Sequence, residues 1–259
     1  IRAIDPDATM IVSPADHLIL REEVFRDAIL QGMDFVEELP SLLTLGVKPT
    51  RAETGYGYIQ IGDESKGAIR SVKTFTEKPN RELAQVFVDS GEFFWNTGIF
   101  IWKAGSIIEA IKQYLPEVSI RFEACSDSFG RPGSEQVVQK QLAACPNISI
   151  DVGIMEKATN VYVLCTDFGW SDVGTWGSLY ALSQKDTCEN VVLHGRATCY
   201  DSHRNIVSTS EKKLVILDGL QDYIVTDSEN VLLICRKSEE QRIRQFVNDA
   251  KTRFGNEYT

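Results

Sequence analysis

Acidic, basic and amide side chains stand beside glycines and aromatic residues in several short segments of the sequence. In residues 13–17 (SPADH), Asp16 follows the apolar run at residues 8–13. Such a run is typical of a buried strand, and open α/β sheets bind ligands at the carboxyl ends of their strands. Asp16 could therefore hold a divalent cation such as Mg²⁺, which prefers carboxylate and phosphate oxygens. The alternative is that Asp16 only caps the helix that follows.

A second acidic segment, residues 167–176 (DFGWSDVGTW), contains two tryptophans, two glycines and two aspartates. Asp172 could be the N-cap of the next helix, which is a frequent role for aspartate. It could also be the second carboxylate on the cation that Asp16 would bind. The residues alone leave both possibilities open.

A third segment, residues 51–58 (RAETGYGY), places Gly55 and Gly57 on either side of Tyr56. Glycine lets a ligand approach the backbone closely, so that peptide groups can form hydrogen bonds with ligand hydroxyls. A tight hairpin would explain the same pattern.

A fourth segment, residues 75–79 (FTEKP), ends a strand-like run with Glu77 and Lys78. A carboxylate can accept hydrogen bonds from sugar hydroxyls, and an ammonium group can bind a phosphate. An exposed ion pair is the simpler alternative.

A fifth segment, residues 95–98 (WNTG), inserts Asn96 and Thr97 into an otherwise apolar, aromatic strand. A buried amide must satisfy its donors and its acceptor, because unpaired polar groups are costly in an apolar environment. A polyhydroxylated ligand is one candidate partner.

The spacing of apolar residues predicts the elements that position these segments. Helical spacing at residues 22–38 lies between buried-strand patterns at 8–13 and 41–47. A strand, a helix and a strand of these lengths predict a βαβ crossover in a parallel α/β sheet. A helix at 80–90 is expected next, with Asn80 as N-cap and Gly91 as terminator. Further strands are expected at 56–61, 69–75, 93–102 and 160–166, and further helices at 104–115, 117–126, 134–144 and after Asp172.

A change of pattern near residue 189 predicts a domain boundary, with residues 1–188 in one domain and residues 189–259 in a small β-rich domain. The second part contains short β-like runs about ten residues apart, separated by turn residues. This pattern is typical of a small barrel, a sandwich or a coil-like solenoid. A final helix is expected from Ser238, whose S-x-x-Q arrangement with Gln241 matches a capping box.

The composition of the 259 residues argues against several classes of protein. The formal charge of −10 argues against a large nucleic-acid surface, which needs clustered Lys and Arg. No stretch approaches the roughly eighteen apolar residues of a membrane span, and the first residues show no signal-peptide pattern. The six cysteines are scattered without zinc-site spacing, which favours reduced thiols in a cytoplasmic protein.

The order of the segments resembles that of one family. SPADH, ETGYGYI, FTEKP, FWNTGIFIW, SIDVGIMEK and WSDVGTW follow one another as in the bacterial mannose-1-phosphate guanylyltransferases. The resemblance covers essentially the whole chain, including the β-rich tail. One departure is Ala52, where the family usually has proline, and we expect this change to loosen the loop only slightly.

This resemblance implies a Rossmann-like, GT-A-like nucleotidyltransferase fold with a mixed α/β sheet and a small β-rich C-terminal domain. It implies transfer of GMP from GTP to mannose-1-phosphate, giving GDP-mannose and pyrophosphate. Asp16 and Asp172 would hold Mg²⁺ between the reacting phosphates, Lys78 would neutralise the sugar phosphate, and His17 is expected to be structural. The residues expected to bind the sugar are Gly55, Tyr56, Gly57, Glu77, Asn96, Thr97, Asp151, Glu156 and Lys157, the last three without assigned roles.

The family's Gly-rich signature, which cradles the nucleoside triphosphate and reads guanine, is absent from this sequence. The resemblance therefore predicts a chain truncated at its N-terminus. Backbone N–H groups of that loop bind the β- and γ-phosphates, so these 259 residues by themselves are expected not to turn over GTP. The resemblance also implies a homodimer, in which the β-rich tail packs against a second subunit.

Three other functions stay open. A nucleotidyltransferase for another sugar or base would share both aspartates and Lys78. A metal-dependent glycosyltransferase also places an acid after an apolar strand, but it does not predict the EKP and WSDVG segments together. A non-catalytic regulatory or assembly subunit could keep the fold without the nucleotide loop.

Overall fold

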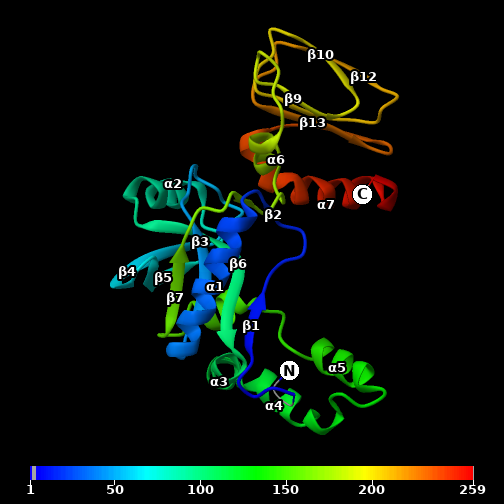
Figure 1. Ribbon diagram of the computed structural model, residues 1–259. Helices are drawn as coiled ribbons and strands as arrows, with labels where there is room; N and C mark the ends of the chain where they lie inside the picture. Colours follow the sequence, from blue (N-terminus) through cyan, green and yellow to red (C-terminus); the bar gives the residue numbers. More distant parts are fainter. Residues whose placement is uncertain (2–3, 259) are drawn as a thin grey trace. The chain divides into compact units, whose positions relative to one another are not determined.

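The computed structural model describes residue 1 and residues 4–258 and divides into two units, Ile1–Trp170 and Ser171–Thr259 (Figure 1). The units divide at residue 170, so that residues 171–188 group with the C-terminal strands. The domain boundary expected at residue 188 from the sequence pattern stays a prediction.

One mixed sheet of six strands forms the centre of the first unit, in the order β1-β6-β3-β7-β5-β4, with β4 also paired to β6. The strands are β1 (Thr9–Val12), β3 (Leu42–Val47), β4 (Tyr58–Lys66), β5 (Ile69–Thr76), β6 (Phe93–Lys103) and β7 (Val161–Cys165). This arrangement confirms the mixed α/β fold.

The position of β6 corrects the parallel arrangement inferred from the spacing. β6 runs antiparallel to both β1 and β3, and it lies between them, while β3 and β7 are parallel neighbours. The two strands of the expected β–α–β unit therefore do not touch. With 11 largely apolar residues, β6 is long enough to pair with β1, β3 and β4, and this length explains its central place.

Helices cover both faces of this sheet. On one face, α1 (Glu22–Glu38) and α2 (Arg81–Ser90) contribute Phe35 and Phe87 to an apolar cluster. On the other, α3 (Ala104–Tyr114) and a π-helical turn, η2 (Asp151–Met155), contribute Ile107 and Ile154 to a second cluster. The remaining elements of this unit are β2 (Leu18–Ile19), α4 (Pro116–Glu123), η1 (Ser126–Ser128) and α5 (Ser134–Ala143), and β8 (Trp170–Ser171) spans the boundary.

The helix ends test three expectations. The Oδ1 of Asn80 accepts a hydrogen bond from the Leu83 N–H, and Gly91 ends α2 with a φ of 73°, as the sequence predicted. Helix α1 begins at Glu22 with Arg21 at the N-cap, and this end has no side-chain cap. The interpretation of Asp16 as a helix cap is therefore wrong.

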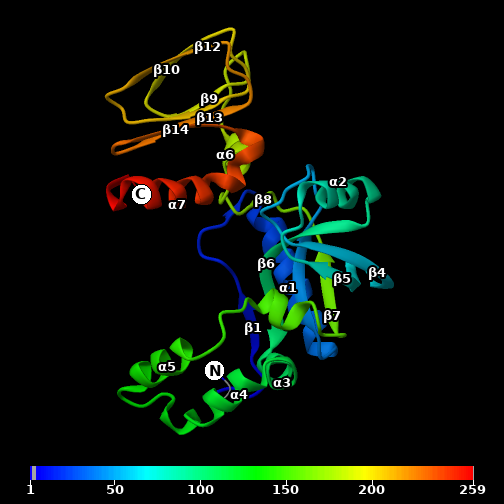
Figure 2. The same cartoon turned by 180° about the vertical axis from the view of Figure 1, so that it is seen from behind.

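The second unit is a coil of short parallel strands that ends in a hairpin (Figure 2). In successive turns, β11 (Ile206–Ser208) pairs in parallel with β9 (Val191–His194) and with β13 (Tyr223–Ser228), and β12 (Leu214–Asp218) pairs with β10 (Arg196–Tyr200). Strand β14 (Val231–Arg236) returns antiparallel to β13. Of the three β architectures that the sequence allowed, the coil-like solenoid is the one observed.

Two buried asparagines join successive turns of the coil. Asn190 and Asn205 are 2% and 0% exposed, and the Nδ2 of Asn205 donates to Oδ1 of Asn190 at 3.0 Å. The Oδ1 of Asn205 accepts from the Tyr223 N–H at 2.9 Å, and its Nδ2 also donates to the Leu220 carbonyl at 2.8 Å. Because these amides bond the backbone of adjacent turns, they fix the stacking of the coil.

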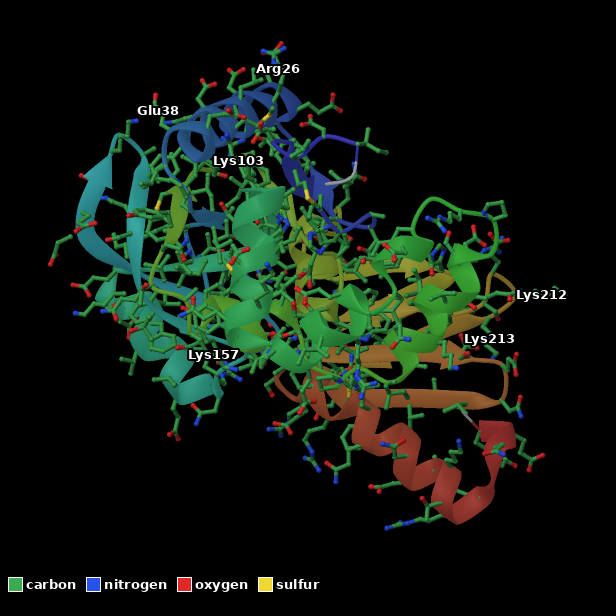
Figure 3. The ribbon with its side chains drawn as sticks, turned by 90° about the horizontal axis from the view of Figure 1, so that it is seen from below. Arg26, Glu38, Lys103, Lys157, Lys212 and Lys213 are labelled. Carbon is green, nitrogen blue, oxygen red and sulfur yellow. The ribbon has the colours of Figure 1, made fainter. Side chains whose placement is uncertain are left out.

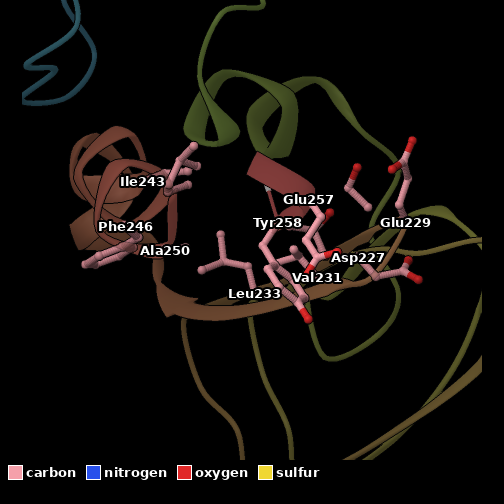
Figure 4. Close-up of a pocket in the computed structure, with 12 residues that line it drawn as sticks. Asp227, Glu229, Val231, Leu233, Ile243, Phe246, Ala250, Glu257 and Tyr258 are labelled. Carbon is pink, nitrogen blue, oxygen red and sulfur yellow. The ribbon is translucent and has the colours of Figure 1, made fainter. Parts of the chain in front are cut away.

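Helices flank the coil within this unit: α6 (Trp176–Leu182), the 3₁₀ turn η3 (Lys237–Arg242), α7 (Ile243–Phe254) and η4 (Asn256–Tyr258). The capping box expected at Ser238 is wrong, because residues 237–242 form the 3₁₀ turn and α7 begins only at Ile243 without a side-chain cap. The carboxylate of Glu240 instead accepts from the Gly177 N–H at 3.0 Å, which ties this turn to α6. An apolar pocket of about 300 Å³ lies between α7 and the β13–β14 hairpin, lined by Leu233 and Ile243 among others (Figure 4).

Among the helices of residues 4–258, none combines the length and the apolar character that crossing a membrane requires.

The asparagine pair generates a prediction for the stability of the coil. Asn205→Ala would remove the side-chain partner of the buried Tyr223 N–H and one hydrogen bond each from the Leu220 carbonyl and the Asn190 amide. We expect a loss of about 2–4 kcal/mol in the free energy of unfolding, measured by urea denaturation. The exposed Asn248 on α7, whose side chain makes no hydrogen bond among the described residues, supplies the control Asn248→Ala. A loss for Asn205→Ala no larger than that of the control would contradict this account.

Candidate functional site

A bulge in β6 shapes the centre of the candidate site. In the pairing of β3 with β6, Thr44 lies opposite Phe100 and Gly46 opposite Asn96, so the three residues 97–99 face the single residue Leu45. Gly98 has a φ of 70°, a backbone conformation that favours glycine. Bulges of this kind redirect side chains and are frequent beside active sites. The WNTG interruption in the apolar strand is therefore this bulge.

The bulge holds the Asn96 amide in one orientation. Its Oδ1 accepts from the Gly98 N–H at 3.3 Å and lies 3.0 Å from Oγ1 of Thr44. Its Nδ2 donates to Oδ1 of Asp151 at 3.0 Å. The partners that the sequence led us to expect for the Asn96 amide are thus protein groups, and one of them is the Asp151 carboxylate.

Glu77 and Lys78 follow the end of β5 and lie beside the same amide. The Nζ of Lys78 is 2.6 Å from Oε1 of Glu77. A Cβ added to Gly57 would lie 2.8 Å from Oε2 of Glu77 and 3.4 Å from Cβ of Asn96, so Gly57 must be glycine for these side chains to pack against it. The structure thus brings together five of the predicted residues: Gly57, Glu77, Lys78, Asn96 and Asp151.

The backbone of Lys78 is strained. Its φ is 46°, in a left-handed region that costs about 1–2 kcal/mol for a residue with a side chain. The following Pro79 restricts this residue further. Strain of this kind persists where the surrounding structure holds it and concentrates at functional positions. The structure contains the Glu77–Lys78 ion pair, with 61% of the Lys78 side chain exposed, so the simpler interpretation as an exposed ion pair stays open beside the functional one.

Asp151 opens the π-helical turn η2, and the environment raises the pKa of its carboxyl. Burial is the largest cause, and the negative charge of Glu77 acts in the same direction. The hydrogen bond from Asn96 and the positive charge of Lys78 oppose it. Two neighbouring carboxylates share one ammonium group here, so a ligand that donates hydroxyl hydrogen bonds would relieve an unfavourable charge arrangement.

The loop before β4 is ordered by Glu53, which the sequence analysis did not single out. This carboxylate is 4% exposed, and it binds Arg51 at 3.0 Å and accepts from the Gly55 N–H at 3.1 Å. The Glu53 N–H donates to the hydroxyl of Tyr58 at 2.9 Å. Gly55 therefore contributes to loop geometry, and its N–H already has a protein partner. The sequence signal that could have identified Glu53 is its place in the glycine-containing segment RAETGYGY.

Aromatic residues pack around Tyr56 in the loop before β4. The ring of Tyr56 packs edge-on against Trp95 and Trp170, at centroid distances of 5.1 and 5.0 Å, and it is 5% exposed. The indole N–H of Trp170 donates to Nδ1 of His17 at 3.1 Å. This bond agrees with a structural role for His17. The buried Tyr56 ring supports the glycines on either side of it.

Asp16 lies in an exposed loop near the bulge. Pro14, in the same loop, comes within 3.7 Å of the position that a Cβ on Gly98 would occupy. Within the described residues, the Asp16 carboxylate makes no hydrogen bond or ion pair. Its oxygens are thus available to a ligand.

Asp172 belongs to the second unit, where its own loop holds it. Its Oδ1 accepts from the Gly174 N–H at 3.0 Å and from the Ser178 hydroxyl at 3.3 Å. The N-cap of α6 is Thr175, whose Oγ1 accepts from the Ser178 N–H, so the N-cap interpretation of Asp172 is wrong. Val173 has a φ of 51°, which is unusual for a β-branched residue. The convergence of Asp16 and Asp172 on one cation stays a prediction.

Three predicted sugar-binding residues lie outside the cluster. Thr97 is 1% exposed, and its hydroxyl donates to the Leu45 carbonyl at 2.9 Å, which fastens the bulge. Glu156 and Lys157 are exposed at the end of η2, and no hydrogen bond or ion pair joins either side chain to the cluster in residues 4–258. Figure 3 labels Lys157. The structure gives these three residues no direct place among the polar groups around Asn96.

The donor chemistry of the two aspartates fits Mg²⁺. Residues 4–258 contain no group of three or more His, Cys, Asp or Glu side chains that could hold a metal ion. Mg²⁺ usually takes only one or two carboxylates and completes its shell with water and substrate phosphates. Asp16, whose exposed carboxylate has no partner among residues 4–258, has the character of such a ligand.

The cluster around Asn96 can bind a hydroxylated, phosphorylated ligand. Glu77 and Asp151 can accept hydrogen bonds from hydroxyls, and Lys78, with 61% of its side chain exposed, can bind a phosphate. The six free cysteines include no nucleophile placed in this cluster. The chemistry that this arrangement supports is binding and orientation of a sugar phosphate.

Two family models match the chain. The model described as "Nucleotidyl transferase" matches residues 2–189, and "MannoseP isomerase/GMP-like beta-helix domain" matches residues 195–249. The mannose-1-phosphate guanylyltransferase of Escherichia coli (strain K12) is 34% identical over 255 residues, which cover 95% of this chain and 52% of the relative. The corresponding protein of Salmonella typhimurium is 35% identical, with the same two coverages. The chain therefore spans about half the length of these relatives.

Solved structures show the same similarity. The crystal structure of mannose-1-phosphate geranyltransferase from Thermus thermophilus matches with a TM-score of 0.81 and 29% identity, over 96% of this chain and 72% of that one. The mannose-6-phosphate isomerase of Helicobacter pylori matches with a TM-score of 0.55 and 27% identity, over 64% of this chain and 65% of that one. The first of these matches spans both units of the present chain.

The raised pKa of Asp151 generates a prediction for stability against pH. The folded carboxyl holds its proton to higher pH than the usual value of 3.8, so folding stability falls as the pH rises through the folded pKa. Asp151→Asn removes this loss and keeps an acceptor for Asn96. We expect the variant to unfold a few degrees above the wild type at pH 7, with a smaller difference near pH 4, by thermal denaturation.

The exposed Asp63 on β4 supplies the matched control Asp63→Asn, which should show no such gain. If Asp151→Asn is less stable than the wild type at pH 7, the carboxylate contributes more to the fold than its burial costs, and this account of the site is wrong.

Proposed function

The chain belongs to the nucleotidyltransferase family, in the mannose-1-phosphate guanylyltransferase group that adds a β-helix domain, and we propose that it acts in the transfer of GMP from GTP to mannose-1-phosphate. The observation that carries the proposal is the cluster of Glu77, Lys78, Asn96 and Asp151 against Gly57, at the ends of β5 and β4 and on the bulge of β6. This cluster places two carboxylates, which can accept hydrogen bonds from hydroxyls, beside the Lys78 ammonium group, which can bind a phosphate.

In this reaction an oxygen of the sugar phosphate attacks the α-phosphorus of GTP, and the bond to pyrophosphate breaks. The chain's residues hold the acceptor for this displacement. Glu77 and Asp151 would accept hydrogen bonds from mannose hydroxyls, and the Lys78 ammonium would bind the 1-phosphate and lower its charge repulsion with the nucleotide. No covalent intermediate is required, since catalysis of such transfers comes mainly from positioning and charge neutralisation.

The proposed cation ligands are Asp16 and Asp172, with Mg²⁺ as the cation. A bound Mg²⁺ would neutralise charge on the reacting phosphates. Thr97 and Glu53 are proposed as supports of the bulge and the loop. Glu156 and Lys157 keep no assigned role.

The function is tested by the full-length gene product in a pyrophosphate-release assay with GTP, mannose-1-phosphate and Mg²⁺. Lys78→Ala should lower kcat/KM by about 10- to 100-fold, because a desolvated charge-assisted contact contributes about 1.5–3 kcal/mol. Lys78→Gly should lose as much activity while unfolding at no lower temperature than Lys78→Ala, since glycine relieves the positive φ. Lys140→Ala, at an exposed lysine of α5, is the control and should retain full activity.

A wild-type protein that releases no pyrophosphate with GTP, but does so with another nucleoside triphosphate or sugar phosphate, would move the proposal to that substrate pair. Wild-type kinetics in Lys78→Ala would show that the ammonium group does not bind the sugar phosphate.

A homodimer is proposed as the functional assembly. The outer face of the β10–β12 sheet exposes Tyr200, Leu214 and Ile216, at 57, 61 and 65%. An apolar patch of this kind usually marks an interface. We expect a dimer by sedimentation at micromolar concentration and a monomer for Ile216→Asp, whereas Leu142→Asp, at an exposed leucine of α5, should stay dimeric. A monomeric wild type would contradict this proposal.

A further inference from the structure

Thr44 places a hydroxyl in the middle of β3, a strand whose other residues are leucine, glycine and valine. The residue is 0% exposed. Its Oγ1 lies 3.0 Å from Oδ1 of Asn96 and 3.1 Å from the carbonyl oxygen of Ile99. Both partners are acceptors, so the Thr44 hydroxyl is the donor, and its single proton is shared between the two oxygens. Valine would fill the same volume without burying a polar group, so the hydroxyl needs an explanation beyond packing.

The hydrogen bond from the Gly98 N–H fixes which end of the Asn96 amide is the oxygen. The Gly98 N–H can only donate, so the amide oxygen must face Gly98 and Thr44. The amide nitrogen must then face Asp151, whose carboxylate can accept. Of the two bonds to the amide oxygen, the one from Gly98 is long at 3.3 Å and the one from Thr44 is shorter at 3.0 Å.

We propose that Thr44 is a positioning residue, whose buried hydroxyl holds the Asn96 amide so that Asn96 orients the Asp151 carboxylate toward the hydroxyls of a bound sugar phosphate. Thr44 does not itself reach a ligand, since it is fully buried. The inference rests on the proposed function for the identity of the ligand, and on the three-residue chain of hydrogen bonds for the role.

The test uses Thr44→Val in the full-length gene product, because valine keeps the shape of the side chain and removes the hydroxyl. Loss of one hydrogen bond in the chain should raise the KM for mannose-1-phosphate by about three- to tenfold. The KM for GTP should stay within about twofold of the wild type, because the chain of hydrogen bonds leads only to the sugar side. Thr44→Ser keeps the hydroxyl and should restore most of the affinity for the sugar phosphate.

A buried threonine in the second unit supplies the matched control. Thr209 is 4% exposed, and its Oγ1 has no hydrogen-bond partner among the described residues. Thr209→Val therefore removes a buried hydroxyl that positions nothing, and both KM values should be unchanged. A general effect of burying valine for threonine would appear equally in the two variants.

A double-mutant cycle with Asn96→Ala decides whether Thr44 acts through Asn96. In the Asn96→Ala background, Thr44→Val should cause no further rise in the KM for mannose-1-phosphate. An additional rise of the same size as in the wild-type background would show that Thr44 acts elsewhere, and it would overturn the inference.

Crystal structures of the variants separate this inference from the proposed function. We expect the Asn96–Asp151 bond to lengthen or break in Thr44→Val and to persist in Thr44→Ser. A broken bond in a protein with no transferase activity would leave the positioning role intact and sink the proposed function. An unchanged bond together with an unchanged KM would overturn the inference alone. If Thr44→Val does not fold, Thr44→Ala takes its place, and wild-type KM in that variant is the overturning result.

Discussion

The site of this protein depends on two extra residues in one strand. Because two residues are inserted, the alternation of β6 is kept: Trp95 and Ile99 pack in one apolar cluster, and Phe100 packs in the other with η2. Within the bulge, Gly98 adopts a left-handed conformation and Thr97 bonds the Leu45 carbonyl, while Asn96, just before the bulge, donates to Asp151. The bulge thus joins polar groups of β3 and β6, and Asn96 carries the connection to η2.

The sequence revealed the local elements well and their pairing poorly. Apolar spacing predicted the helix at residues 22–38, and the Asn80 and Gly91 signals marked the ends of α2. Such signals act over three or four residues, and they are present in the sequence itself. The place of β6 between β1 and β3 depends on pairing across the whole unit, for which the sequence has no local signal. The same limit applies to the capping box expected at Ser238. Residues 237–242 form a 3₁₀ turn there, and Glu240 of this turn bonds Gly177, which is far away in the sequence.

Within the candidate site, the sequence predicted the participants and not their connections. The WNTG segment indicated a polar interruption, but only the partner strand shows that Thr97 is a fastener and that Asn96 donates to Asp151. Thr44 and Glu53 escaped notice because a buried hydroxyl and a buried acid look ordinary in sequence. Their importance comes from partners that fold next to them. Asp16 lies in the first unit and Asp172 in the second, and their binding of one shared cation stays a prediction.

The asparagines of the two units differ in what their amides bind. In the coil, the amides of Asn190 and Asn205 bond backbone groups and one another, and this arrangement fixes the stacking of turns. In the sheet, Asn96 directs its nitrogen to a carboxylate whose pKa is raised by burial and by Glu77. That carboxylate would be better placed in water if folding were the only requirement. A charge held in such a position, next to a strained lysine, is an arrangement that a ligand completes, and this is the physical reason to place the sugar phosphate there.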